Sequence, residues 1–181
     1  SKRVTSVWDG LEFIVTSYKD SKDVFILGSV EDITVALDES LVTLNTILGS
    51  RYCAPLRTEV ESWQRKLMLL SDTVDEWLQC QKQWMYLETI FAADDIKRQL
   101  EEESKRFFGV DKSWKNIMQR TNSNPKVVVA GTAKGLKEQL IRHNEVLDAI
   151  QKSLEEYLET KRLAFPRFYF LSNEELLEIL A

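Results

Sequence analysis

A long seam of apolar residues through the middle of the sequence constrains its fold more than any other feature. The seam alternates spacings of four and three residues through Leu56, Val60, Trp63, Leu67, Leu70, Val74 and Trp77. It then steps by three to Cys80 and continues to Trp84, Leu87 and Phe91. These spacings place the side chains on one face of an α-helix. We therefore predict one helix over residues 56–91, about 54 Å long, with an irregular seam between Trp77 and Trp84.

Two other stretches carry the same helical period. Over residues 29–48 the apolar positions are Ile33, Leu37, Leu41, Leu44 and Leu48. Ser29 and Asp32 are the expected N-terminal cap of this helix, and Gly49 follows its expected end. After Thr132, the expected cap of the last long helix, the period passes through Leu136, Leu140, His143, Leu147, Ile150, Leu154 and Tyr157. The sequence therefore predicts three long helices.

Shorter elements are expected between the second and the third of these helices. The pair Asp94-Asp95 favours a helix start, Gly109 favours its end, and residues 111–118 are predicted to form another short helix. The polar residues 121–125 predict a loop. The three valines at 127–129 favour an extended segment.

The first thirty residues have a different pattern. Leu11, Phe13 and Val15 alternate with other residues, and a polar connection at 19–23 separates them from an apolar run at 24–27. Such a pair of runs predicts a β-hairpin, which needs a helix to pack against because two strands alone are marginally stable. We therefore expect a mainly α fold, an elongated bundle of long helices with a small N-terminal β-hairpin. Residues 1–30 would form the hairpin region and residues 31–181 the helical subdomains.

An aromatic block interrupts the helical period near the C-terminus. It comprises Phe165, Pro166, Arg167, Phe168, Tyr169 and Phe170. Pro166 disfavours a helical conformation of the preceding residue, so the last long helix is predicted to end near Phe165. Ser172 and Glu175 form a capping box that predicts a final helix carrying Leu176, Leu177 and Leu180. Since a buried aromatic ring covers roughly 150–250 Å², we expect Phe168 and Phe170 to pack against this final helix or the preceding one.

Composition and motifs exclude several classes of function. A net charge of −5 argues against broad electrostatic binding to nucleic acid or anionic lipid. No apolar run approaches the roughly 20 residues that span a bilayer. Gly131 and Gly135 are too close together for a Walker A loop, so this stretch is interpreted as a turn into a helix. The start, Ser1-Lys2-Arg3-Val4, has no initiator Met and no signal core, and we expect a segment of a longer chain.

Histidine and cysteine, the residue types that most often bind zinc or act as nucleophiles with a histidine, are rare in this sequence. The sequence contains one histidine, His143, within a helical seam, and two cysteines, Cys53 and Cys80, which are expected to be reduced thiols. Zinc sites built on several histidines are therefore excluded. The acidic run 101–103 is interpreted as a solvated helix face because Lys97, Lys105 and neighbouring basic residues balance it. We predict no catalytic, cofactor-binding or metal-binding residue in these 181 residues.

Two sequence blocks resemble dynein heavy chains. Residues 84–91, Trp-Met-Tyr-Leu-Glu-Thr-Ile-Phe, are similar to the family segment W-x-Y-L-E-x-I-F. Residues 154–180 contain Lys161-Arg162 followed by Phe165-Pro166-Arg167-Phe168-Tyr169-Phe170-Leu171-Ser172, which resembles the linker motif K-R-x-x-F-P-R-F-Y-F-L-S. The order Leu171-Ser172-Asn173 is closer to axonemal than to cytoplasmic heavy chains.

The resemblance implies a mechanical function. The dynein linker precedes the first AAA+ module, arches across the ring, and bends or straightens as the ring binds and hydrolyses ATP. The expected partners are the AAA+ ring of the same chain and other dynein subunits reached through the tail, with microtubules held only by the distant stalk. ATP and Mg²⁺ would be bound by the ring and not by this segment. The expected location is the cytoskeleton, in the axoneme of a cilium.

Candidate mechanical or packing residues follow from the seams and the aromatic block. They are Trp77, Trp84, Phe165, Pro166, Phe168, Tyr169 and Phe170. Candidate hinges are the irregular seam between Trp77 and Trp84 and the predicted loop at 121–125, because long helices bend where regular packing is interrupted. The alternative function is a helical scaffold or adaptor outside any motor. An enzyme with carboxylates in the bundle core is a third reading, but it would need histidines that the sequence lacks.

Overall fold

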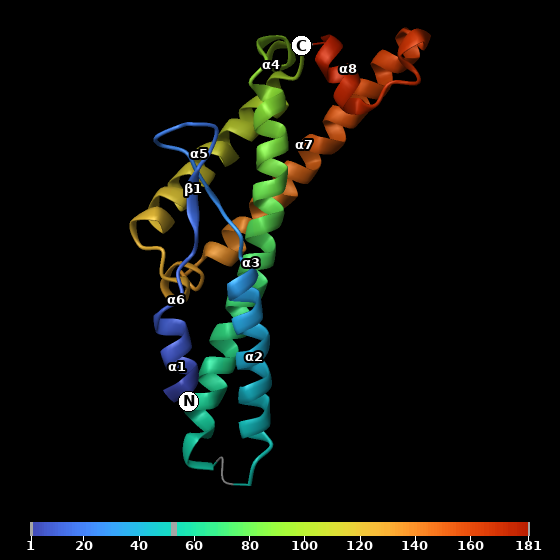
Figure 1. The fold of residues 1–181 in the computed structure, drawn as a ribbon. Coiled ribbons are helices and arrows are strands. Elements are labelled where there is room, and N and C mark those ends of the chain that lie inside the picture. Colours follow the sequence, from blue (N-terminus) through green and yellow to red (C-terminus); the bar gives the residue numbers. More distant parts are fainter. Residues whose placement is uncertain (1, 52–53, 181) are drawn as a thin grey trace. The chain divides into compact units, whose positions relative to one another are not determined.

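Helices form most of the computed structural model, which describes residues 2–51 and 54–180 (Figure 1). The α-helices are α1 (Lys2–Asp9), α2 (Glu31–Leu48), α3 (Arg57–Phe91), α4 (Asp94–Gln99), α5 (Glu101–Ser123), α6 (Val127–Ala130), α7 (Leu136–Ala164) and α8 (Asn173–Leu180). Short 3₁₀ turns lie at Ala54–Leu56 and Pro166–Phe168. The predicted fold class, mainly α with a small β-hairpin near the N-terminus, is confirmed. None of the described helices is long and apolar enough to cross a membrane.

The chain divides into two compact units. The first contains Ser1–Leu78 and Lys115–Leu140, and the second contains Gln79–Trp114 and Ile141–Ala181. The chain passes from one unit to the other within α3, α5 and α7, because each of these helices includes a unit boundary. The predicted division into a hairpin region, 1–30, and helical subdomains, 31–181, stays a prediction.

Helix α3 has 35 residues and matches the predicted long helix. Most of the predicted seam is buried: Val60, Leu67, Leu70, Val74, Trp77, Cys80, Trp84, Leu87 and Phe91. Leu56 is the exception, because it lies in the 3₁₀ turn before α3 and is 44% exposed. Trp63 is half-buried. The spacing therefore identified the buried face correctly from the second position onward.

The β-hairpin lies where the N-terminal pattern predicts it. Strand β1 (Val15–Ser17) pairs antiparallel with β2 (Phe25–Leu27), with Val15 opposite Leu27. Phe13, just before β1, packs on the Trp77 ring of α3 with ring centroids 4.9 Å apart. The hairpin thus has the helical support that two short strands need.

Residues 2–9 form α1, a helix that our sequence analysis did not predict. Val4 and Trp8 are buried one helical turn apart, and the Trp8 Nε1–H donates to Ser40 Oγ at 3.1 Å. A helix of eight residues is marginal by itself. Contact with α2 is therefore what orders it.

Two predictions in the middle of the chain, the helix end at Gly109 and the loop at 121–125, are wrong. Gly109 does not end a helix, because α5 runs through it from Glu101 to Ser123 and also takes up most of the predicted loop at 121–125. Burial of Phe107 and Trp114 on either side of Gly109 offsets the cost of a glycine inside a helix. Helix α4 begins at Asp94 as predicted, and α5 takes the place of the rest of that predicted helix and of the one predicted at 111–118.

Residues 127–130 form a helical turn, α6, and not the predicted extended segment. The amides of Ala130 and Gly131 donate to the carbonyls of Lys126 and Val127, which closes the turn. Thr132 does not cap α7, since α7 begins four residues later and the Thr132 hydroxyl donates to the Val128 carbonyl. An extended segment would need a partner strand along its length, and among the described residues the only bridge at this segment joins Lys126 to Glu12.

Candidate functional site

The candidate site is the junction between α7 and α8, which contains the aromatic block. Helix α7 ends at Ala164, and Phe165 leaves helical geometry with φ −129° and ψ 86°. Pro166 causes this break, because its ring clashes with a helical conformation of the residue before it. The Phe168 and Tyr169 amides then donate to the carbonyls of Phe165 and Pro166, which forms a 3₁₀ turn. The predicted helix end is confirmed.

Helix α8 begins with the predicted N-terminal cap. The Ser172 hydroxyl oxygen accepts the Glu175 amide at 3.1 Å, and the Ser172 carbonyl accepts the Leu176 amide at 3.0 Å. A side-chain oxygen at this position satisfies an amide that has no partner inside the helix. Leu176 and Leu177 are buried, so the cap starts a helix whose apolar face is packed.

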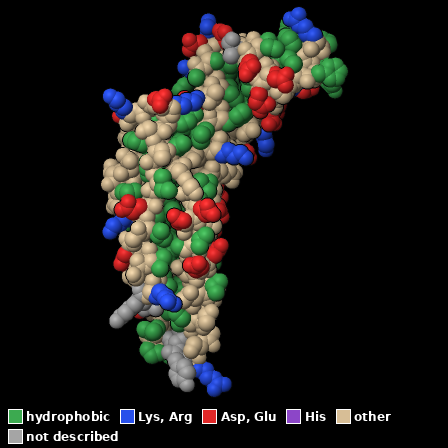
Figure 2. Space-filling view, in the orientation of Figure 1, with side chains coloured by type: hydrophobic (Ala, Val, Ile, Leu, Met, Phe, Trp, Pro, Cys, Tyr) green, Lys and Arg blue, Asp and Glu red, His purple; other side chains and the backbone are tan. Residues whose placement is uncertain are grey.

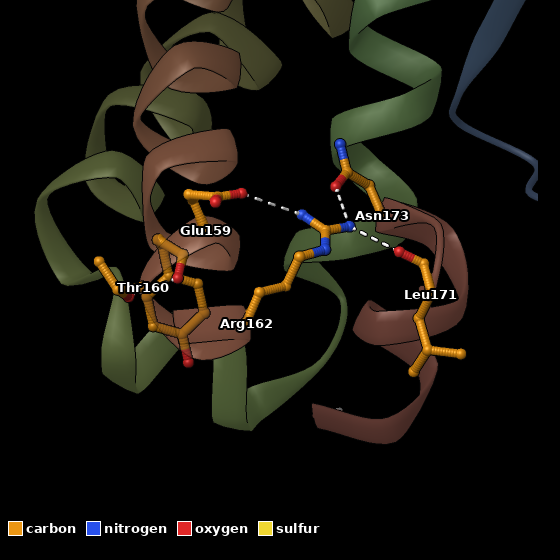
Figure 3. A network of polar contacts seen from close by, with 6 residues as sticks. Glu159, Thr160, Arg162, Leu171 and Asn173 are labelled. Carbon is orange, nitrogen blue, oxygen red and sulfur yellow. Dashed lines mark hydrogen bonds and ion pairs between the residues drawn. The ribbon is translucent and has the colours of Figure 1, made fainter. Parts of the chain in front are cut away.

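Arg162 joins the end of α7 to the start of α8 (Figure 3). Its Nη2 donates to the Leu171 carbonyl at 2.9 Å and to Asn173 Oδ1 at 2.7 Å. Its Nη1 lies 3.7 Å from Glu159 Oε2, one turn earlier on α7. Only 13% of the Arg162 side chain is exposed, so these bonds are partly screened from water. The guanidinium therefore fixes the direction in which α8 leaves α7.

The aromatic block does not pack as the sequence predicts. Phe170 is 92% exposed, Tyr169 63% and Phe165 46%, while Phe168 is half-buried. The predicted packing of Phe170 on a helix is therefore wrong. The physical reason is the 3₁₀ turn after Pro166, which closes the chain on itself while Leu176 and Leu177 fill the interior positions of α8.

The rings of the block contact one another and Arg167. The Arg167 guanidinium lies 4.8 Å from the Phe168 ring centroid and 5.8 Å from that of Phe165, within cation–π range. Tyr169 and Phe170 meet edge to face at 5.5 Å. We call Leu163, Phe165, Tyr169 and Phe170 the exposed aromatic patch, since Leu163 is also 71% exposed. Clustered exposed apolar side chains of this kind mark interaction surfaces.

Trp77 and Trp84 are both fully buried. Trp84 donates from Nε1 to Asp111 Oδ1 at 2.8 Å and stacks on Trp114 at 5.4 Å. Trp77 packs on Phe13, and its Nε1 finds no acceptor among the described residues. The sequence predicts burial at both positions. No sequence pattern identifies Asp111 as the hydrogen-bond partner of Trp84. The two residues are 27 positions apart and lie on different helices, so local spacing does not relate them.

His143 lies at a contact between two helices. His143 Nε2 lies 2.7 Å from Ser113 Oγ, between α7 and α5. Burial, followed by the charge of Arg142, lowers the pKa of His143 below its usual value. Among residues 2–51 and 54–180, no three His, Cys, Asp or Glu side chains are grouped as a metal site would need. Cys80 is buried and Cys53 lies outside the described residues, so the prediction of two reduced thiols stays a prediction.

Comparison with known proteins gives a consistent result over the whole chain. Residues 1–181 match the family described as "Dynein heavy chain, N-terminal region 2". The chain is 54% identical to human "Dynein axonemal heavy chain 6" over 180 residues, which is 99% of this chain. It is 44% identical to rat "Dynein axonemal heavy chain 12" over 97% of its length and 43% identical to mouse "Dynein axonemal heavy chain 1" over 96%.

These relatives are much longer proteins. The chain spans 4% of the human heavy chain 6, 6% of the rat heavy chain 12 and 4% of the mouse heavy chain 1. The similarity therefore concerns one N-terminal region.

Proposed function

Because the chain belongs to the dynein heavy chain family, we propose that it is a mechanical linker element of a dynein microtubule motor. The element transmits ATP-driven conformational change from the AAA+ ring to the tail. ATP and Mg²⁺ bind in the ring, and the segment has no catalytic role of its own. Its partners are the ring of the same heavy chain and, through the tail, other dynein subunits. Microtubules are held elsewhere, by the stalk.

The observation that carries this proposal is the passage of three helices between the two units. Each unit boundary falls inside α3, α5 or α7, with Leu78 and Gln79 adjacent in α3. A helix transmits force along its axis because its hydrogen bonds repeat every turn. Packed side chains prevent such helices from sliding independently. Transmission of force through continuous helices is what a mechanical element requires.

The irregular seam of α3 supplies the proposed hinge. The unit boundary between Leu78 and Gln79 lies within the interval from Trp77 to Trp84, where the spacing shifts. The other predicted hinge, residues 121–125, belongs to a single unit and is largely helical. Bending concentrates where the regular packing of a helix changes, so we place the hinge at the seam irregularity.

The α7–α8 junction supplies the proposed output contact. Arg162 holds the junction in one geometry, and the exposed aromatic patch lies beside it. A force-bearing contact needs a rigid support and apolar surface to bury. The axonemal relatives support a location in the axoneme of a cilium.

The test is a double substitution in the assembled motor, Phe168→Ala with Phe170→Ala. We expect slower microtubule gliding for each ATP hydrolysed, because the exposed aromatic patch loses Phe170, its most exposed ring, and the neighbouring half-buried Phe168 ring against which Arg167 lies. A matched control is Val35→Ala with Val42→Ala, which removes exposed apolar side chains from α2. Gliding per ATP that equals that of the control, with only stability lowered, would contradict a mechanical role of the patch and leave it a packing element alone.

A further inference from the structure

A groove in the second unit lies between the C-terminal part of α3, α4 and α8. Its volume is about 340 Å³. Ile90, Ile96 and Leu177 line it and keep only 8%, 1% and 8% of their surface exposed. Ala93, Thr89 and Tyr86 complete the wall on the α3–α4 side. The floor is therefore apolar and large enough for one bulky side chain.

The rim of the groove on α8 is acidic. Glu174 and Glu178 line it one helical turn apart. Helix α8 contains three glutamates and no Lys or Arg, and Figure 2 shows acidic side chains gathered over it beside hydrophobic surface. Burial, then the charges of Glu174 and Glu155, raise the pKa of the Tyr86 hydroxyl, which is consistent with a negative field at this wall.

The rim carboxylates form no ion pair with a described basic side chain, although Lys82 and Lys152 line a neighbouring hollow that also includes Glu174. On α4, Lys97 lies 3.8 Å from Asp94 and Arg98 lies 2.9 Å from Asp95. Within the described part of the chain, no Lys or Arg pairs with Glu174 or Glu178. The groove thus combines an apolar floor with two carboxylates that form no ion pair with any basic side chain in the described part of the chain.

We propose that this groove binds a cationic amphipathic helix from outside these 181 residues. One large apolar side chain of that helix fills the space above Ile90, Ile96 and Leu177. Lys or Arg residues one turn to either side contact Glu174 and Glu178, whose own spacing is one helical turn. An acidic segment would be repelled, and an uncharged one would leave the carboxylates unmatched. Charge complementarity therefore selects the partner.

The experiment places a photoreactive benzophenone amino acid at Ala93 in the assembled heavy-chain complex. Ala93 lines the groove. The control probe replaces Glu156, an exposed residue of α7 that does not line it. Irradiation and mass spectrometry then identify the cross-linked peptide. We expect a cross-link from position 93 only, to a peptide with a large apolar residue and Lys or Arg within four positions of it.

A charge variant tests the acidic rim directly. Glu178→Lys should lower the cross-linking yield at least about tenfold, because placing like charges opposite each other opposes binding. This variant is compatible with folding, since a basic residue is favourable in the last turn of a helix. The matched control is Glu156→Lys on α7, the same charge change at an exposed residue outside the groove lining, which should leave the yield within about twofold.

Any of three results would overturn the proposal. They are equal cross-linking from positions 93 and 156, a captured peptide without basic residues, and equal losses for Glu178→Lys and Glu156→Lys. None of these readouts depends on gliding, so this proposal and the proposed linker function can fail separately.

Discussion

Trp77 and Trp84 lie in the same helical seam, yet their indole N–H groups differ in hydrogen bonding. Trp84 donates to Asp111, whereas Trp77 has no acceptor among the described residues. A buried donor without a partner costs free energy, so the apolar contact with Phe13 must offset that cost at Trp77. The Trp77 side chain thus stabilises the fold through the apolar volume that it fills.

Trp77→Ala should lower the free energy of unfolding by roughly 3–5 kcal/mol, because it opens a cavity beneath Phe13. Trp63→Ala is the control, since Trp63 is half-buried in the same helix and its loss should cost less. Denaturant unfolding followed by circular dichroism measures both. A loss below about 1 kcal/mol for Trp77→Ala would show that the hairpin is not anchored on this ring.

His143 gives the fold a defined pH dependence. Its pKa is lowered by burial and by Arg142, so protonation favours the unfolded chain. Its contribution to stability is complete above the unfolded pKa of about 6.5. It is lost as the pH falls from there through the lower folded pKa.

His143→Gln should flatten the unfolding free energy against pH over this window. Gln can still hydrogen-bond to Ser113 but does not titrate. His143 is the only histidine of the sequence, and His is the side chain that ordinarily titrates between pH 5 and 8. Unfolding midpoints at several pH values measure the effect. Parallel curves for the two proteins would contradict the assignment.

At the scale of the element, α5 shows how packing overrides a local stop signal. Gly109 is a residue type that ends helices, and the sequence predicts such an end. In the structure, Phe107, Val110 and Trp114 are all buried along one face of α5. Their burial stabilises a continuous helix by more than the roughly 1 kcal/mol that an interior glycine costs.

Gly109→Ala should therefore stabilise the protein by about 0.5–1 kcal/mol. An added Cβ meets no atom within 4 Å, and the backbone is helical there. The comparison is Gly131→Ala, where a Cβ would lie 2.2 Å from a Leu70 side-chain atom and 2.8 Å from the Val127 carbonyl oxygen. That variant should be destabilised. Thermal unfolding distinguishes the two, and a lower midpoint for Gly109→Ala would contradict a regular α5.

At the scale of the whole molecule, apolar periodicity together with helix-breaking and capping residues is sufficient to predict the main elements. The buried face of α3, the hairpin, the break at Pro166 and the cap at Ser172 were all predicted. These features depend on interactions within a few residues, or on one face of one helix. Local patterns encode them because the physical cause is itself local.

Long-range contacts decided the rest. Helix α1 forms because Trp8 reaches Ser40, and α5 is continuous because its apolar face is covered. The aromatic block is exposed because Arg162 turns the chain into α8, whose leucines take the interior positions. The groove between α3, α4 and α8 combines residues up to 92 positions apart, from Tyr86 to Glu178. Such surfaces exist only after distant helices pack together, and no local spacing records which helices those will be.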